Sequence, residues 1–246
     1  MRRVEKSGIP GQILESEATP ESEKQFDIFY LQTLESAAAG TSEAKKDAVR
    51  LLVNLVYATS NNRNLPVEAL RAFIPEAPGG PLDKPEDLLV DLGTILTTDL
   101  HTNTIQACHP SFFTFLGDPK RSKDFWMEPT QLDMLMTEKC IDIMMAGLKF
   151  NVCDLENSYL LNSEVQDLEG RINQCIAKEL QYSCLYWMNH LSGCTVEYLP
   201  KHSIRRKLQG LLCDVSVIYW IEVLSLLSEL DEAARILQEL DRKSVV

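Results

Sequence analysis

Apolar side chains recur every three or four residues along most of this chain, and that spacing predicts amphipathic helices. Candidate helix starts support the pattern, because Ser42 and Asp231 suit the N-cap position while Pro66 and Pro85 suit the first helical turn. The sequence therefore predicts a mainly α fold. We expect helices over residues 26–34, 42–56, 66–73, 85–96, 129–148, 168–191, 208–219 and 231–240.

One short stretch departs from the helical spacing. Residues 97–100 and 104–108 are rich in β-prone side chains and flank a polar His-Thr-Asn turn, which predicts a β-hairpin. Three helices followed by a small hairpin is the element order of a winged helix. A Pro-Ser-Phe-Phe-Thr-Phe-Leu segment follows over residues 110–116, and Gly117-Asp118-Pro119 ends it.

Composition and breaker residues divide the chain into three parts. Residues 1–24 are rich in Glu, Ser, Pro and Gly and are predicted to be a disordered tail. Residues 25–118 hold a helical segment and the winged-helix domain with its small hairpin. Residues 119–246 are predicted to be an α-helical domain built from helical pairs.

The charge of the chain argues against a nucleic-acid partner. Lys and Arg number 24 against 36 Asp and Glu, a formal net charge of −12. The helix that would enter a DNA groove, within residues 84–91, carries three acids and one lysine. Residues 48–200 hold eleven basic and twenty acidic side chains, and Arg205-Arg206-Lys207 is best explained as a solvated helix face.

Targeting signals and cysteine usage favour a cytoplasmic protein. The N-terminal residues lack the apolar core of a signal peptide, and the most apolar stretch, residues 215–227, falls short of the roughly 20 residues of a membrane span. We therefore expect no membrane partner. The seven cysteines are widely spaced without a Cys-x-x-Cys pair, so we expect reduced thiols.

Strong catalytic motifs are absent from the sequence. No Gly-Lys dipeptide exists, which excludes a P-loop, and His-Glu-x-x-His and Gly-x-Ser-x-Gly are missing. A Cys108–His109 dyad is disfavoured because strand neighbours point to opposite faces. We expect no enzyme activity, no catalytic residue, no metal and no cofactor bound by this chain alone. The spacing of Cys184, His190, Cys194 and His202 fits no common zinc site.

One segment carries a family resemblance. The run Cys-His-Pro-Ser-Phe-Phe-Thr-Phe-Leu over residues 108–116 contains a His-x-Ser-Phe-x-x-Phe-Leu pattern. This pattern resembles the signature that ends the winged-helix domain of NACHT-type STAND NTPases, the class that includes NOD-like receptors. Four further segments, in order, are similar to the fungal branch of that class: residues 27–35, 160–165, 185–191, and 220–227 with 230–233.

The resemblance, which spans about residues 26–240, implies a regulatory role in signalling. In such proteins an upstream NACHT domain binds ADP or ATP, the winged helix closes over it, and downstream helices lead to a repeat domain. The family's winged-helix histidine touches the β-phosphate of ADP, and His109 is the matching position. ADP or ATP would thus be bound only in a complete parent protein, because the P-loop is absent here.

Three interpretations follow from the sequence. The first is a non-enzymatic module that gates a nucleotide-dependent switch, with the NACHT and repeat domains as its partners. The second is a helical scaffold that binds another protein through an exposed apolar surface. The third, which the acidic charge disfavours, is a winged-helix DNA binder. Under the first interpretation we expect a fragment of a longer protein, and under the second a stand-alone chain.

Overall fold

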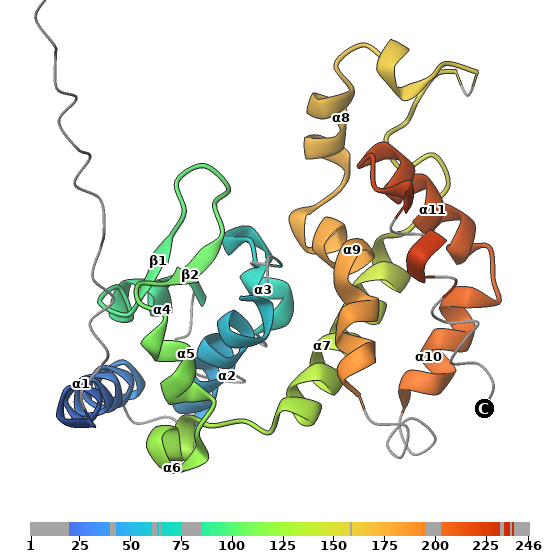
Figure 1. Cartoon of the computed structure of the whole chain (residues 1–246). Helices are drawn as coiled ribbons and strands as arrows, with labels where there is room; N and C mark the ends of the chain where they lie inside the picture. Colours follow the sequence, from blue (N-terminus) through green and yellow to red (C-terminus); the bar gives the residue numbers. More distant parts are fainter. Residues whose placement is uncertain are drawn as a thin grey trace, which may run out of the picture.

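The computed structural model contains two lobes of helices joined side by side (Figure 1). It describes residues 20–39, 43–60, 63, 65–74, 85–157, 159–194, 203–231, 234–236 and 238. The prediction of a mainly helical fold with one small hairpin is confirmed. Residues 1–19, Ser42, the Pro- and Gly-containing residues 75–81, His202 and half of the predicted last helix lie outside the described residues.

The first helix of the N-terminal lobe (residues 20–125) is longer than predicted. Helix α1 runs over Pro20–Ala38, so residues 20–24, which we expected to belong to a disordered tail, are helical. Proline suits the first turn of a helix, and Glu21 and Glu23 lie at the positive end of the helix dipole, which explains the early start.

Helix α2, Glu43–Thr59, forms the centre of this lobe. From Ala48 on, apolar residues follow one another around nearly all sides of the helix, and this part of it is buried on most sides. One polar residue in it, Asn54, is buried but satisfied, since its side-chain amide donates to the backbone oxygens of Arg50 and Phe125 at 2.7 Å each. Asn54 thereby fixes the chain that leads out of the lobe.

Two predicted helix boundaries near α2 are wrong. Pro66 is extended, with φ −64° and ψ 143°, and precedes the short helices η1, Val67–Ala69, and α3, Leu70–Phe73. Helix α4, Pro85–Asp91, ends before Leu92 and Leu96, which we had placed in it. Both leucines are nonetheless buried, because a tight turn at 92–95 redirects the chain into the first strand.

The predicted hairpin is present and slightly shorter. Strand β1, Leu96–Thr98, pairs antiparallel with β2, Ile105–Ala107. A further bridge joins Pro66 to Thr104, where the Ile105 N–H donates to the Leu65 oxygen at 3.0 Å. This pairing explains why Pro66 is extended rather than helical. The segment before η1 thus lies against the outer edge of β2.

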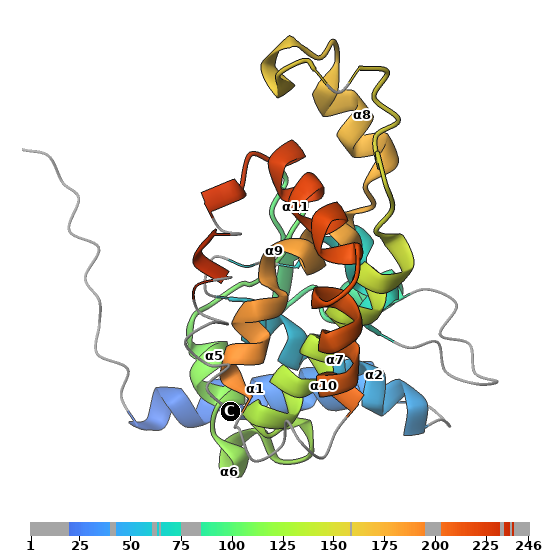
Figure 2. The same cartoon turned by 90° about the vertical axis from the view of Figure 1, so that its right-hand side faces the viewer.

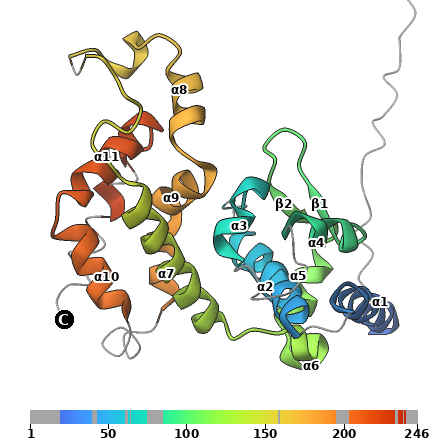
Figure 3. The same ribbon diagram turned by 180° about the vertical axis from the view of Figure 1, so that it is seen from behind.

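The chain then passes between the lobes. Helix α5, Ser111–Leu116, follows the hairpin, and Asp118 caps α6, Pro119–Ser122. The turn η2, Lys123–Phe125, leads into the long helix α7, Pro129–Gly147, which begins at the predicted residue. Seen from behind, α7 carries the chain from the N-terminal lobe into the C-terminal one (Figure 3).

In the C-terminal lobe (residues 129–236), α7 packs along α9, Lys178–Gly193, with α10, Ser203–Leu212, and α11, Ser216–Leu226, beside them (Figure 2). The turn η3, Asn162–Glu164, precedes α8, Leu168–Cys175, which lies at one end of the lobe. The indole N–H of Trp220 donates to the Cys184 oxygen at 2.9 Å, which fixes α11 on α9.

Two long predicted helices are each broken in two. The helical region 168–191 is interrupted at Ile176, because this side chain is fully buried at the corner and the Gln181 amide donates to its carbonyl at 2.7 Å. The helix predicted over 208–219 is interrupted at residues 213–215, because α10 packs on α7 whereas α11 packs on α9. The two axes differ by 75°.

Candidate functional site

His109, the residue singled out by the sequence, lies where β2 passes into α5. The backbone fixes this junction, because the Cys108 N–H donates to the Ile95 oxygen at 2.9 Å and the Phe112 N–H donates to the His109 oxygen at 3.1 Å. The imidazole is exposed. A short strand and the first turn of a helix therefore hold this ring at the surface of the N-terminal lobe.

Hydrogen bonds fix the tautomer of His109. A backbone N–H can only donate, and the Ser111 N–H lies 3.2 Å from His109 Nδ1, so Nδ1 is the acceptor. The Ser111 hydroxyl, 2.8 Å from the same nitrogen, then donates to it as well. The Tyr30 hydroxyl in turn donates to Ser111 Oγ at 2.7 Å. The neutral ring consequently carries its proton on Nε2.

Helix α1 supports the ring from its other side. Phe26 stacks on His109 with ring centroids 5.7 Å apart and an interplanar angle of 9°. One turn later, the buried Tyr30 ring packs against Phe112 and Phe115 of α5 at 5.1 and 5.2 Å. The orientation of His109 thus depends on where α1 lies.

A bidentate ion pair holds α1 in this position. The Arg121 guanidinium of α6 donates to both carboxylate oxygens of Asp27, with its Nη2 2.7 Å from Oδ1 and its Nε 2.9 Å from Oδ2. The two side chains are about four-fifths buried, at 23% and 21% exposed. Such planar pairing is more directional than a single contact and favours one position of α1.

This arrangement presents one hydrogen-bond donor to the solvent. With Nδ1 occupied by Ser111, the proton lies on Nε2 of this exposed residue, and no described residue bonds to Nε2. A fixed imidazole N–H suits an anionic oxygen such as that of a phosphate. The ring has no hydrogen bond to Cys108 within the described part of the chain, so the two residues form no dyad there.

Sequence reasoning found His109 but not its support. Ser111 belongs to the same motif, yet its role as the link between His109 and α1 needs the structure. Phe26 and Tyr30 lie about 80 residues earlier and were expected only as the apolar face of a helix. The aromatic content of that face was the one available signal.

The residues considered for zinc are not brought together. Cys184 is buried beside Cys140, His190 bonds Tyr182 and Asp133, and His202 lies outside the described residues. Within the described ranges, no group of three or more His, Cys, Asp or Glu side chains is arranged to hold a metal ion. No single described helix is long and apolar enough to span a membrane, although α10 and α11 would pass on length and composition as a bent pair.

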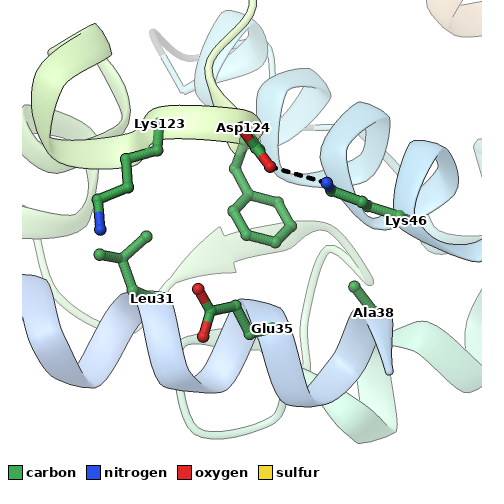
Figure 4. Close-up of a pocket in the computed structure, with 7 residues that line it drawn as sticks. Leu31, Glu35, Ala38, Lys46, Lys123 and Asp124 are labelled. Carbon is green, nitrogen blue, oxygen red and sulfur yellow. Dashed lines mark hydrogen bonds and ion pairs between the residues drawn. The ribbon is translucent and has the colours of Figure 1, made fainter. Parts of the chain in front are cut away.

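A hollow of about 290 Å³ lies between α1, α2 and η2 and is a second candidate site. Figure 4 shows the ion pair of Lys46 and Asp124, 2.8 Å long, on one side and Leu31, Glu35 and Ala38 of α1 on the other. The hydrogen bond from Lys46 lowers the pKa of the Asp124 carboxyl, and the same bond to Asp124 raises the pKa of Lys46. Because these two charges already satisfy each other, the hollow is a weaker candidate than His109.

Comparisons with known proteins add no relative. No model of a protein family matches the chain, and neither a curated protein nor a solved structure matches it.

Proposed function

We propose that this chain is a non-enzymatic switch module, a winged-helix domain followed by a helical domain, like those of the fungal NACHT-type STAND NTPases. In this proposal, His109 donates its Nε2–H to a phosphate of ADP held by a separate nucleotide-binding domain, in the same polypeptide or on a partner. The observation that carries it is the exposed His109 side chain, whose Nδ1 is bonded to Ser111 and whose Nε2 has no partner among the described residues.

The order and pairing of elements in the N-terminal lobe support the winged-helix part. A central helix, α2, is followed by the extended residues 65–66, the short helices η1 and α3, helix α4 and then the hairpin. The bridge from Pro66 to Thr104 adds a third strand segment beside β2. A two-stranded hairpin with this added bridge, following a run of helices, is compatible with a winged-helix domain.

The contacts of α1 suggest how the switch would work. A phosphate near Nε2 favours the ring position in which Phe26 stacks on it and Ser111 holds it. Loss of the phosphate removes that preference and leaves the Asp27–Arg121 ion pair and the packing of Tyr30 as the contacts that hold α1, so the balance between the two positions of α1 shifts. A ligand shifts such an equilibrium only by its different affinity for the two states, which here resides in one charge-assisted hydrogen bond.

The release of ADP from the intact assembly tests this proposal. His109→Ala should speed ADP release by about tenfold, the size expected from losing one charge-assisted hydrogen bond. His101→Ala is a matched control, since His101 is also an exposed histidine and lies at the tip of the hairpin. Equal ADP release rates in the wild type and His109→Ala would contradict the role of His109.

A second function, a protein-binding scaffold, is favoured by exposed apolar side chains. Ile28 on α1 is 56% exposed, and Phe150 beside Tyr219 is 77% exposed. Exposed apolar side chains mark interaction surfaces where they form a patch, and these two residues mark two separate candidates, one in each lobe. Binding of a hydrophobic dye that falls in Phe150→Ser and Ile28→Ser, with unchanged helix content, would favour this function, whereas a wild type that binds no dye would exclude it.

A further inference from the structure

A cavity of about 540 Å³ lies where the two lobes meet. Its walls come from the end of α2, from α5, from the start of α7 and from the end of α9. Cavities of this size and position commonly bind small molecules. The chemistry of its lining is unusual for an incidental gap, because it combines a carboxylate, a guanidinium and an unsatisfied amide with aromatic rings: Asp133, Arg63, Asn189, Tyr57, Phe113 and Met127 line it.

Hydrogen bonds from Tyr182 through His190 position the carboxylate of Asp133, which lines the cavity. Burial raises the pKa of Tyr182 well above its ordinary value, so its hydroxyl keeps its proton and donates to His190 Nε2 at 2.9 Å. His190, which is fully buried, then carries its own proton on Nδ1 and donates it to Asp133 Oδ1 at 3.4 Å. The Asp133 carboxylate accepts this bond on Oδ1 and has acceptor capacity left on Oδ2.

A close approach to a glycine also positions this carboxylate. An added Cβ on Gly193 would lie 1.8 Å from Asp133 Oδ2, so only glycine leaves room for the carboxylate there. Beside it, Asn189 Oδ1 is buried and has no hydrogen-bond partner among the described residues. An unpaired buried carbonyl oxygen is costly, and Asn189 is one of the residues that line the cavity.

The positive charge has no partner in the described part of the chain. Arg63 lines the same cavity as Asp133, yet no ion pair joins them in the described residues. Both charges act on the pKa of Tyr182, Arg63 lowering it and Asp133 raising it, which places both near that hydroxyl. Tyr57 and Phe113, with ring centroids 6.1 Å apart, supply an apolar wall between α2 and α5.

We propose that this cavity binds a free α-amino acid with an apolar side chain. The ammonium group would donate to Asp133 and Asn189, the carboxylate would accept from Arg63, and the side chain would pack on Tyr57, Phe113 and Met127. A ligand with one charge only would leave Arg63 or the two acceptors unmatched. Because the lining comes from both lobes, the bound amino acid bridges them.

Calorimetric titration of the whole chain with L-leucine tests the proposal. We expect saturable binding that weakens at least tenfold for L-leucinamide, which lacks the carboxylate, and for N-acetyl-L-leucine, which lacks the ammonium group. These comparisons use the wild-type protein, so they do not depend on the folding of any variant. Absence of saturable heat with L-leucine at millimolar concentration, or equal affinity for all three compounds, would overturn the proposal.

Variants assign the two ends of the site. Arg63→Ala should bind L-leucine about tenfold more weakly while losing the preference for L-leucine over L-leucinamide. Asn189→Leu should weaken L-leucine but not N-acetyl-L-leucine. Arg171→Ala on α8 is the matched control and should bind as the wild type does. A folded Arg63→Ala variant that keeps the preference for L-leucine over L-leucinamide would overturn the assignment.

Discussion

At the scale of single residues, the Ser111 hydroxyl links two side chains. It accepts a hydrogen bond from the Tyr30 hydroxyl and donates one to the His109 ring. Ser111→Ala should lower the free energy of unfolding by about 1–2 kcal/mol, because the buried Tyr30 hydroxyl loses its partner. Tyr30→Phe should have little further effect in that background. Urea denaturation of both single variants and the double variant measures the coupling, and strictly additive effects would contradict the chain of bonds.

Two helical glycines make a matched pair at the same scale. Gly193→Ala should destabilise the protein by about 1–3 kcal/mol, because the new Cβ meets the Asp133 carboxylate and must displace it from His190. Gly210→Ala on α10 should instead stabilise by up to about 1 kcal/mol, since its Cβ would lie 3.6 Å from Met145 Cε, an ordinary contact. Thermal unfolding distinguishes the two, and equal effects would contradict the crowding at Gly193.

At the scale of elements, Asp99 closes the turn between β1 and β2. Its Oδ1 accepts hydrogen bonds from the backbone N–H groups of Thr102 and His101, each at 2.9 Å. These bonds, of which the one from Thr102 has the larger effect, lower the pKa of the Asp99 carboxyl below its ordinary value of 3.8. A lowered folded-state pKa contributes stability that is present above the unfolded value and lost as the pH falls through the folded one.

The turn should therefore persist in mild acid. In an NMR titration, the Thr102 amide shift should change with a midpoint below 3.8, and the change should vanish in Asp99→Asn. A midpoint at or above 3.8 would show that Asp99 does not cap the turn in solution.

The elements also show how far the sequence could be interpreted. The apolar stripe that predicts residues 129–148 matches α7 closely, because the packing partner α9 covers one continuous face. The breaks at Ile176 and at residues 213–215 carry no proline or glycine signal, since each arises from the helices on either side packing against different partners. Periodicity records which residues are buried but not what they are buried against.

At the scale of the whole molecule, the thiols should report the common core of α7 and α9. Burial raises the pKa of Cys140 to about 12 and raises that of Cys184 as well, whereas Cys108 and Cys213 are exposed. Iodoacetamide should modify Cys108 and Cys213 in the native protein, and Cys140 and Cys184 only at the rate of unfolding. Mass spectrometry assigns the sites; native-state modification of Cys140 as fast as Cys213 would contradict this core.

The sites themselves are properties of the whole molecule. The motif around His109 is visible in the sequence, but Phe26 and Tyr30 join it only because α1 docks on α5. The cavity between the lobes draws Arg63 from the segment after α2, Asp133 from α7 and Asn189 from α9, none within a shared motif. Long-range pairings of this kind follow from packing, so no local pattern could have predicted them.

The most direct test of the proposed function is the nucleotide content of the native assembly that contains this chain. The chain itself has a mass of 27.8 kDa, and an antibody against it would isolate whatever polypeptide or complex carries it in cells. We predict a species several times heavier, with bound ADP that is reduced by His109→Ala and not by His101→Ala. A 27.8 kDa species without bound nucleotide would contradict the account, and so would an ADP content that is equal in the wild type and His109→Ala.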